Sequence, residues 1–334
     1  MNTKQRVLAA LLLTATLGFA QPGAFHPGRA SDAQAKWDAY LAMPPWPAEA
    51  RAELLIRIER ELAPTAANVS AAVARLGRTS SMDEERSLVR LLGQLHFKSP
   101  DTAVRATIER LLVSLAAAPG TQKAVATAAV TTYSRMGYFG DSIAVVNRAQ
   151  AAGLLHPDDY YRELVVMVAG APSADQLKLL RMIRAGNNAF GLELMADLLV
   201  HRETVESLET PVLQEAQALL ADREPGFSSE PGSFGVSSMK RYQDWMMASV
   251  LVDSRVRGEP HHVNMARRIK FIESDPRKLL SVLATEPTAP IARAGLDRAA
   301  VRRIDAVLVD YARQHPQSLI RETTAEARTT LAAP

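Results

Sequence analysis

Apolar residues recur at helical spacing along almost the whole chain, and this pattern most constrains what the chain can fold into. One stripe, at positions i, i+3, i+4 and i+7, consists of Leu88, Leu91, Leu92 and Leu95. A strand with one buried face would instead alternate apolar and polar residues. No segment shows a convincing alternation of that kind, so the sequence predicts an all-α fold in which each helix turns its apolar stripe toward a neighbour.

The composition agrees with a helical protein held together by packing. Glycine is scarce, at 17 of 334 residues, and the abundant Ala, Leu, Arg and Glu favour helix. The length suffices for one long array of helices or for two domains. The chain has no cysteine, so it contains no disulfide, and we expect its stability to come from packed apolar side chains.

The first twenty residues have the three parts of a secretory signal peptide. Lys4 and Arg6 precede an apolar run over residues 7–19, and the small residues Gly18 and Ala20 stand where a signal peptidase would cut. Such a segment directs export and is removed by a peptidase. We therefore predict cleavage near Ala20, a disordered leader over residues 21–31, and a periplasmic or secreted mature protein.

The charge balance argues against a nucleic-acid partner. The whole chain carries a formal net charge of +3, and the predicted signal holds two basic residues and no acidic one. The remainder is therefore almost neutral, whereas nucleic-acid binding needs a basic surface. The mature sequence also contains no apolar stretch long enough to predict a transmembrane segment.

Residues that typically begin or end helices divide the chain into segments. Between Pro100 and Leu220 the breaks recur roughly every 15–20 residues, so a helical hairpin spans about 35–40, as in repeat arrays. Residues 224–238 are rich in Gly, Ser and Pro. We interpret them as a loop between an N-terminal repeat array (32–223) and a C-terminal helical region (239–332), or as an insertion within one array.

Two stretches resemble known helical-repeat families. The first spans residues 133–149 and resembles a tetratricopeptide repeat through Tyr133, Gly137, Phe139, Ser142, Val146 and Ala149. Its continuation over 153–164 is similar to the pentatricopeptide variant. The second, residues 89–95 followed by 100–105, resembles a HEAT repeat. These resemblances imply an α-solenoid of stacked antiparallel hairpins that binds a partner protein on its concave face.

Catalytic and metal-binding motifs are weak in this sequence. His261 and His262 form the only histidine cluster, which lacks the spacing of a metal motif, so we predict a structural role and no metal or cofactor. Ser237 and Lys240 match Ser-x-x-Lys of penicillin-recognising enzymes, but the companion Lys-Thr-Gly is absent. We therefore predict no catalytic residue.

An enzymatic alternative rests on one short resemblance. Asn187 and Asn188 resemble part of the Asn-Asn-His motif of helical-toroid polysaccharide lyases, although Ala189 stands in the histidine position. The alternative function is an exported all-helical enzyme that acts on polysaccharide or cell-wall glycan. The structural interpretation is that Gly186 and Asn187 end a helix, because both residue types accept left-handed backbone.

The predicted binding surface follows the loop. Lys240, Arg241, Tyr242 and Trp245 join basic and aromatic groups of the kinds enriched at protein interfaces. Alternatively, Tyr242, Trp245 and Met246 form one core stripe, which leaves Arg241 on the other side of the helix as the stronger candidate. The leading prediction is an exported, non-enzymatic helical-repeat protein that binds another protein in the bacterial envelope, as an adaptor, assembly factor or immunity-type binder.

Overall fold

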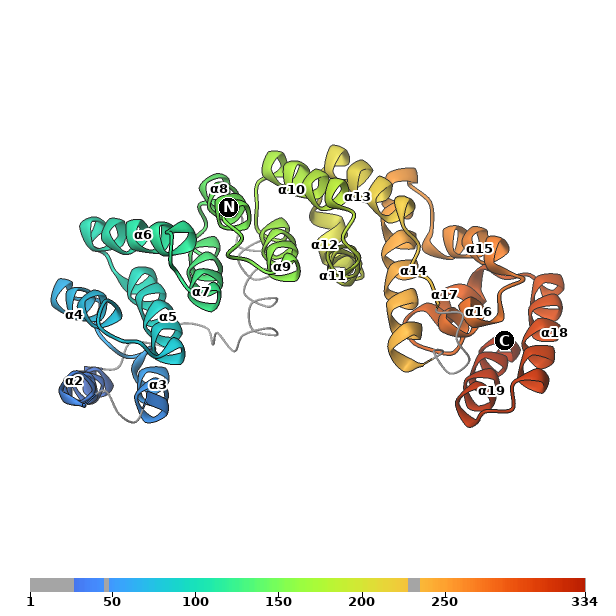
Figure 1. The fold of residues 1–334 in the computed structure, drawn as a ribbon. Helices are drawn as coiled ribbons and strands as arrows, with labels where there is room; N and C mark the ends of the chain where they lie inside the picture. The colour runs from blue at the N-terminus through green and yellow to red at the C-terminus, as the bar shows by residue number, and fades with distance from the viewer. Residues whose placement is uncertain (1–26, 45–47, 228–234, 334) are drawn as a thin grey trace. The chain divides into compact units, whose positions relative to one another are not determined.

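The computed structural model describes residues 27–44, 48–227 and 235–333 (Figure 1). Within these ranges the chain forms eighteen α-helices, α2 to α19, and no strand, which confirms the all-α class. The predicted signal peptide and residues 21–26 of the predicted leader lie outside the described residues. Residues 27–31, which we also expected in that leader, form the beginning of α2.

The described residues belong to two compact units, which divide between Asp175 and Gln176. We refer to them as the N-terminal and the C-terminal unit. The N-terminal unit contains α2 (Pro27–Ala42), α3 (Ala48–Ile58), α4 (Ala66–Leu76), α5 (Met82–Lys98), α6 (Thr102–Ala117), α7 (Lys123–Ser134), α8 (Phe139–Ala151) and α9 (Pro157–Val168).

Helices of the N-terminal unit pack in two rows (Figure 1). One row consists of α3, α5, α7 and α9, each in contact with the next, and the other consists of α4, α6 and α8. Contacts of α4 with α5, α6 with α7 and α8 with α9 join the rows. The predicted leucine stripe of α5 is fully buried between these neighbours.

Side-chain caps start several of these helices. Thr65, Ser81 and Asp101 each accept a hydrogen bond from an amide in the first turn of α4, α5 and α6. Asp101 accepts from the amides of both Ala103 and Val104, since its carboxylate reaches two orphan donors at once.

The C-terminal unit is arranged around one long helix. It contains α10 (Ser173–Gly186), whose first turn holds the division, α11 (Ala189–Leu199), α12 (Arg202–Ser207), α13 (Thr210–Asp222), α14 (Val236–Arg257), α15 (His261–Ile272), α16 (Pro276–Leu283), α17 (Thr288–Gly295), α18 (Arg298–Gln314) and α19 (Ser318–Ala332). Helix α14 contacts α11, α12, α13, α15 and α16. Its residues 245–252 are all buried, as in a helix surrounded by others.

The segment over residues 224–238, where one interpretation placed a domain boundary, joins α13 to α14. These two helices pack extensively against each other within the C-terminal unit. The described compact units instead divide at residues 175 and 176. Residues 236–238 belong to the first turn of α14, and residues 228–234 lie outside the described residues.

One glycine sets the distance between α5 and α7. A Cβ atom added to Gly93 would lie 2.3 Å from Cγ2 of Thr132, far inside van der Waals contact. Gly93 occupies the interior of α5. The close approach of the two helices, rather than a turn, explains why a residue without a side chain stands there.

We expect Gly93→Ala to destabilise the N-terminal unit by about 1–3 kcal/mol, because overpacking outweighs the better helix propensity of alanine. The second substitution Thr132→Ser removes the obstructing methyl group and should recover most of this loss. Gly140→Ala is the matched control, since a Cβ there meets nothing within 4 Å. Urea unfolding of the wild type and these three variants measures the effect, and an equal response of Gly93→Ala and Gly140→Ala would contradict it.

Candidate functional site

The two basic residues of the predicted binding surface lie exposed at the start of α14. Nη1 of Arg241 lies 3.0 Å from Oε1 of Glu193 on α11. Nζ of Lys240 lies 3.8 Å from Oδ1 of Asp197 and also pairs with Asp244 one turn ahead. Both positive charges therefore face carboxylates, and they help to hold α11 against α14.

The two aromatic residues of that surface lie in the core instead. The Tyr242 hydroxyl donates to Oε1 of Glu224 at 2.8 Å, and Nε1 of Trp245 donates to the carbonyl oxygen of Leu220 at 2.9 Å. Burial, followed by the carboxylate of Glu224, raises the pKa of Tyr242. Tyr242, Trp245 and Met246 are all buried. The alternative in which these three residues form one core stripe is therefore confirmed.

Residues 224–227 of the Gly/Ser/Pro segment are fastened to α14 and α16. Glu224 accepts the Tyr242 hydroxyl and pairs with Nζ of Lys278 at 2.9 Å. The centroid of the Phe227 ring lies 5.4 Å from that of Tyr242, and Cζ of Arg277 lies over the Phe227 ring, 5.6 Å from its centroid. This end of the segment is therefore part of the packed structure, which its loop-like composition did not indicate.

The Asn-Asn pair connects α10 to α11. Asn187 has a φ of 45°, in the left-handed region, and Oδ1 of Asn188 accepts the amide of Gly191 at 2.9 Å. Asn187 thus ends the turn after α10, and Asn188 caps α11. The end of α10 at Gly186 and the left-handed backbone of Asn187 confirm the interpretation that these two residues end a helix.

An open cavity of about 560 Å³ lies in the C-terminal unit. Its lining comes from α12, the start of α15 and α17, and comprises Arg202, Glu259, Pro260, His261, His262, Pro290, Ile291 and Ala294. A smaller cavity of about 180 Å³ shares Arg202, Glu259 and His261 with it. Sequence reasoning assigned the two histidines a structural role and did not connect them with Arg202, which lies on another helix.

The charged groups at this cavity are largely paired. Nη1 and Nη2 of Arg267 bind the two carboxylate oxygens of Glu259 at 3.0 and 3.2 Å. Nε of Arg202 binds Oε1 of Glu206 at 2.6 Å. Burial and then the charge of Arg202 lower the pKa of His261, so its imidazole is neutral at pH 7. Nδ1 of His261 is buried and has no hydrogen-bond partner among the described residues.

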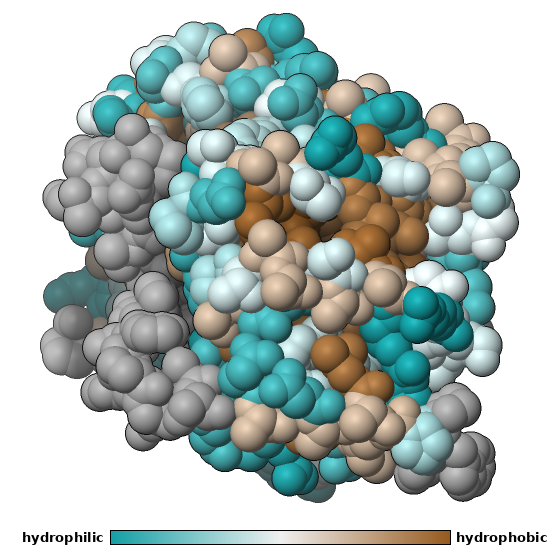
Figure 2. All heavy atoms as spheres, turned by 90° about the vertical axis from the view of Figure 1, so that its left-hand side faces the viewer, coloured by the Kyte–Doolittle hydropathy of each residue, from teal (hydrophilic) through white to brown (hydrophobic). Residues whose placement is uncertain are grey.

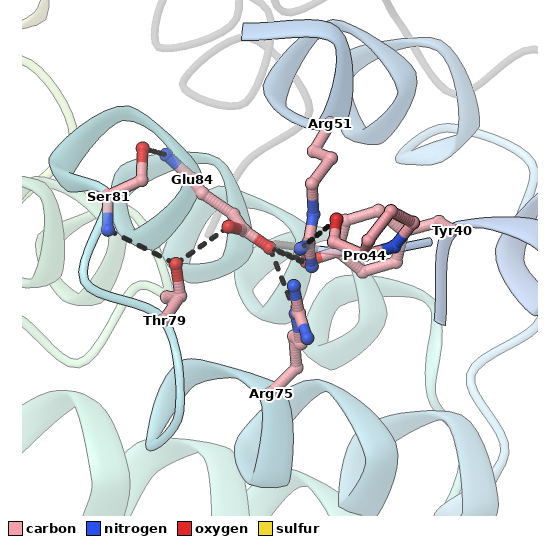
Figure 3. Close-up of polar contacts among 7 residues, drawn as sticks. All are labelled: Tyr40, Pro44, Arg51, Arg75, Thr79, Ser81 and Glu84. Carbon is pink, nitrogen blue, oxygen red and sulfur yellow. Dashed lines mark hydrogen bonds and ion pairs between the residues drawn. The ribbon is translucent and has the colours of Figure 1, made fainter. Parts of the chain in front are cut away.

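A second polar cluster is buried in the N-terminal unit, around Glu84 (Figure 3). Oε1 of Glu84 accepts hydrogen bonds from the Tyr40 hydroxyl at 2.6 Å, from Nη2 of Arg51 at 2.6 Å and from Nε of Arg75 at 3.0 Å. Nη1 of Arg51 also donates to the carbonyl oxygen of Pro44 at 2.9 Å. The donors come from α2, α3 and α4, so one carboxylate on α5 ties four helices together.

The local sequence explains how Glu84 is oriented. Ser81 and Glu84 have the spacing of a capping box, in which the glutamate would bind back to the serine amide. Here Thr79 stands between them: its hydroxyl accepts the Ser81 amide at 3.2 Å and donates to Oε2 of Glu84 at 2.6 Å. The carboxylate is thereby left free to reach Arg51 and Tyr40.

The Glu84 cluster is closed to ligands. The side chains of Arg51 and Glu84 are 0% and 2% exposed. Burial and the neighbouring carboxylate raise the pKa of Tyr40, which stays protonated and donates its hydrogen bond. Nη1 and Nη2 of Arg51 are paired, and only its Nε is buried without a hydrogen-bond partner among the described residues. Groups so enclosed hold the fold, and chemistry on a substrate would need an opening that this cluster lacks.

Buried carboxylates also lie along the row of α3, α5, α7 and α9. Just after α3, Glu59 pairs with Nη2 of Arg90 on α5 at 3.1 Å, and burial raises the pKa of Glu59. On α9, Glu163 accepts the hydroxyls of Thr131 and Ser134 of α7 at 2.5 and 2.7 Å. Each pair joins neighbouring helices of the row.

The described residues have few features of known function. They contain no group of three or more His, Asp or Glu side chains able to hold a metal ion. None of their helices is both long and apolar enough to cross a membrane. Comparisons with protein-family models, with curated proteins and with solved structures found no match to the chain.

We expect Glu84→Ala to destabilise the protein by about 3–5 kcal/mol, because it leaves the Arg51 charge buried without a partner. Glu53→Ala is the control, since Glu53 and Arg57 form an exposed pair at 3.6 Å whose loss costs less than about 1 kcal/mol. Urea unfolding compares the two variants. Equal small losses would show that the buried cluster contributes nothing beyond a surface ion pair.

The buried amine of Lys98 should make the stability of the protein depend on pH. Nζ donates to the carbonyl oxygens of Glu59 and Leu62 at 3.0 and 3.3 Å, and burial lowers the pKa of Lys98 to about 8. Between that pKa and the usual lysine pKa of 10.5, the folded protein holds fewer protons on this amine than the unfolded chain does. The contribution of Lys98 to the free energy of unfolding therefore rises with pH between about 8 and 10.5.

Lys98→Gln keeps a donor near the two carbonyls and removes the titration. We expect the free energy of unfolding of the wild type, relative to this variant, to increase from pH 8 to pH 10.5. Urea unfolding of both proteins at three pH values in this range measures the difference. A difference that stays constant with pH would contradict the lowered pKa.

Proposed function

We propose that this chain is an exported, non-enzymatic helical-repeat protein that binds another protein in the bacterial envelope as an adaptor, assembly factor or immunity-type binder. The observation that carries the proposal is the packing of the N-terminal unit into two rows of successive helices. In an α-solenoid, stacked antiparallel hairpins produce such rows and leave one row available to a partner.

Exposed apolar side chains support a binding role for this unit. Figure 2 looks onto the N-terminal unit and shows apolar surface that lies partly in a hollow. Leu41, Ile56, Met82 and Phe97 are large apolar residues exposed on α2, α3 and α5. Contiguous apolar surface with a polar surround is typical of protein interaction sites. We place the binding face on the row of α3, α5, α7 and α9.

Export rests on the sequence of residues 1–20, with cleavage near Ala20 and a mature protein that is periplasmic or secreted. The cavity of the C-terminal unit supports the second candidate, an enzyme acting on polysaccharide or cell-wall glycan, because arginine, histidine and glutamate line it. Most glycoside hydrolases use an available pair of carboxyl groups. The ion pairs of Glu259 with Arg267 and of Glu206 with Arg202 therefore favour the binding function.

One capture experiment tests both parts of the proposal. The full chain with a C-terminal tag is expressed in its native host, recovered from the periplasmic or secreted fraction after mild crosslinking, and analysed by mass spectrometry. We expect the intact mass of a chain that begins at Gln21. We also expect one protein partner to be captured in stoichiometric amount. A chain that still begins at Met1 in the cytoplasm would contradict export, and glycan fragments without a protein partner would favour the enzyme.

A matched pair of variants locates the binding face. Ile56→Ser removes an exposed β-branched side chain from α3, and Val236→Ser removes a similar one from α14 in the other unit. We expect Ile56→Ser to lower the captured partner about tenfold, as at an apolar hot spot, and Val236→Ser to leave it unchanged. Equal capture by both variants would contradict the assignment of the face to this row.

A further inference from the structure

The cavity in the C-terminal unit has an apolar wall and a polar edge. Ile291 and Ala294 of α17, with the prolines at positions 260 and 290, supply the wall. Arg202 of α12 and the two histidines at the start of α15 supply the edge. Small-molecule sites commonly combine these two kinds of lining, and their volumes of roughly 300–1,000 Å³ include the size of this cavity.

Rigid helices form the cavity. A Cβ atom added to Gly295 would lie 2.2 Å from the carbonyl oxygen of His262 and 2.9 Å from Cβ of Ala266. The end of α17 therefore packs directly on the backbone of α15. This contact fixes the apolar residues of α17 beside the two histidines, and a site on packed helices is better defined than one on a loop.

Arg202 is the exposed side chain at the edge that can donate to an anionic group. Arg267 already neutralises Glu259 through two hydrogen bonds. Arg202 uses Nε for Glu206, its one ion-pair partner among the described residues, and its side chain remains 69% exposed. A guanidinium offers five donors in a fork that matches a carboxylate. The first turn of α15 also has no side-chain cap, so its amides add to the positive potential.

We infer that this cavity binds a carboxylate attached to an apolar body, with Arg202 and His262 at the carboxylate and α17 along the apolar part. Two sources supply that chemistry: the C-terminal carboxylate of a peptide with an apolar last residue, and a free aliphatic acid. The inference does not depend on the proposed protein-binding face, which lies in the other unit.

The test uses four probes with the full mature chain. Hexanoate and hexanamide represent the aliphatic source, and N-acetyl-Ala-Ala-Leu as its free acid and as its amide represents the peptide source. Imidazole proton signals, assigned with His261→Gln and His262→Gln, report binding by NMR. We expect saturable shifts with at least one acid and none with its amide. The acid that binds more tightly identifies the source.

The variant Arg202→Gln tests whether binding depends on a direct contact with Arg202 or only on the net charge of the protein. It removes an exposed ion pair at the start of α12, so the fold should persist, and we expect the dissociation constant to rise about tenfold. Arg298→Gln, which removes an exposed arginine from α18, is the control for net charge and should have no effect. Equal binding of acids and amides, no saturable shift with any probe, or an unchanged affinity in Arg202→Gln would overturn the inference.

Discussion

Each helix of this protein has an apolar stripe that only another helix can cover, and the whole arrangement depends on that constraint. No disulfide is available to a chain without cysteine. In the N-terminal unit, each helix from α4 to α9 packs against a neighbour in its own row and against a helix of the other row. The distance between α5 and α7 then depends on Gly93, because two helices can approach closely only where a side chain is absent.

At the beginning of the rows, packing is supplemented by a buried charge cluster. Two guanidinium groups and a phenol surround Glu84, and these groups bring α2, α3 and α4 against α5. A buried ion pair adds little net stability, since desolvation offsets most of the attraction, but breaking it is costly. The cluster therefore fixes one arrangement of the four helices where an apolar contact would accept several.

The sequence predicted the features that depend on local spacing. The leucine stripe of α5, the helix end at Asn187 and the core stripe of α14 all follow from residues within two turns of each other. The Glu84 cluster was missed because Tyr40 and Arg51 lie 44 and 33 residues before it. The cavity was missed for the same reason: Arg202 and Ile291 belong to helices far from His261 in the sequence, and no local pattern relates them.

The start of α14 illustrates why residue type alone does not identify a binding surface. Tyr242 and Trp245 have the composition of an interface hot spot, yet each gives its polar atom to a neighbouring segment and buries its ring. A long helix contacted by five others needs large side chains with a polar tip, since the tip can satisfy an otherwise orphaned group. The same residue types occur in protein cores and at interfaces, so only the exposure of a side chain distinguishes a binding residue from a core residue. In the C-terminal unit it favours the edge of the cavity, where Arg202 and His262 remain open to solvent.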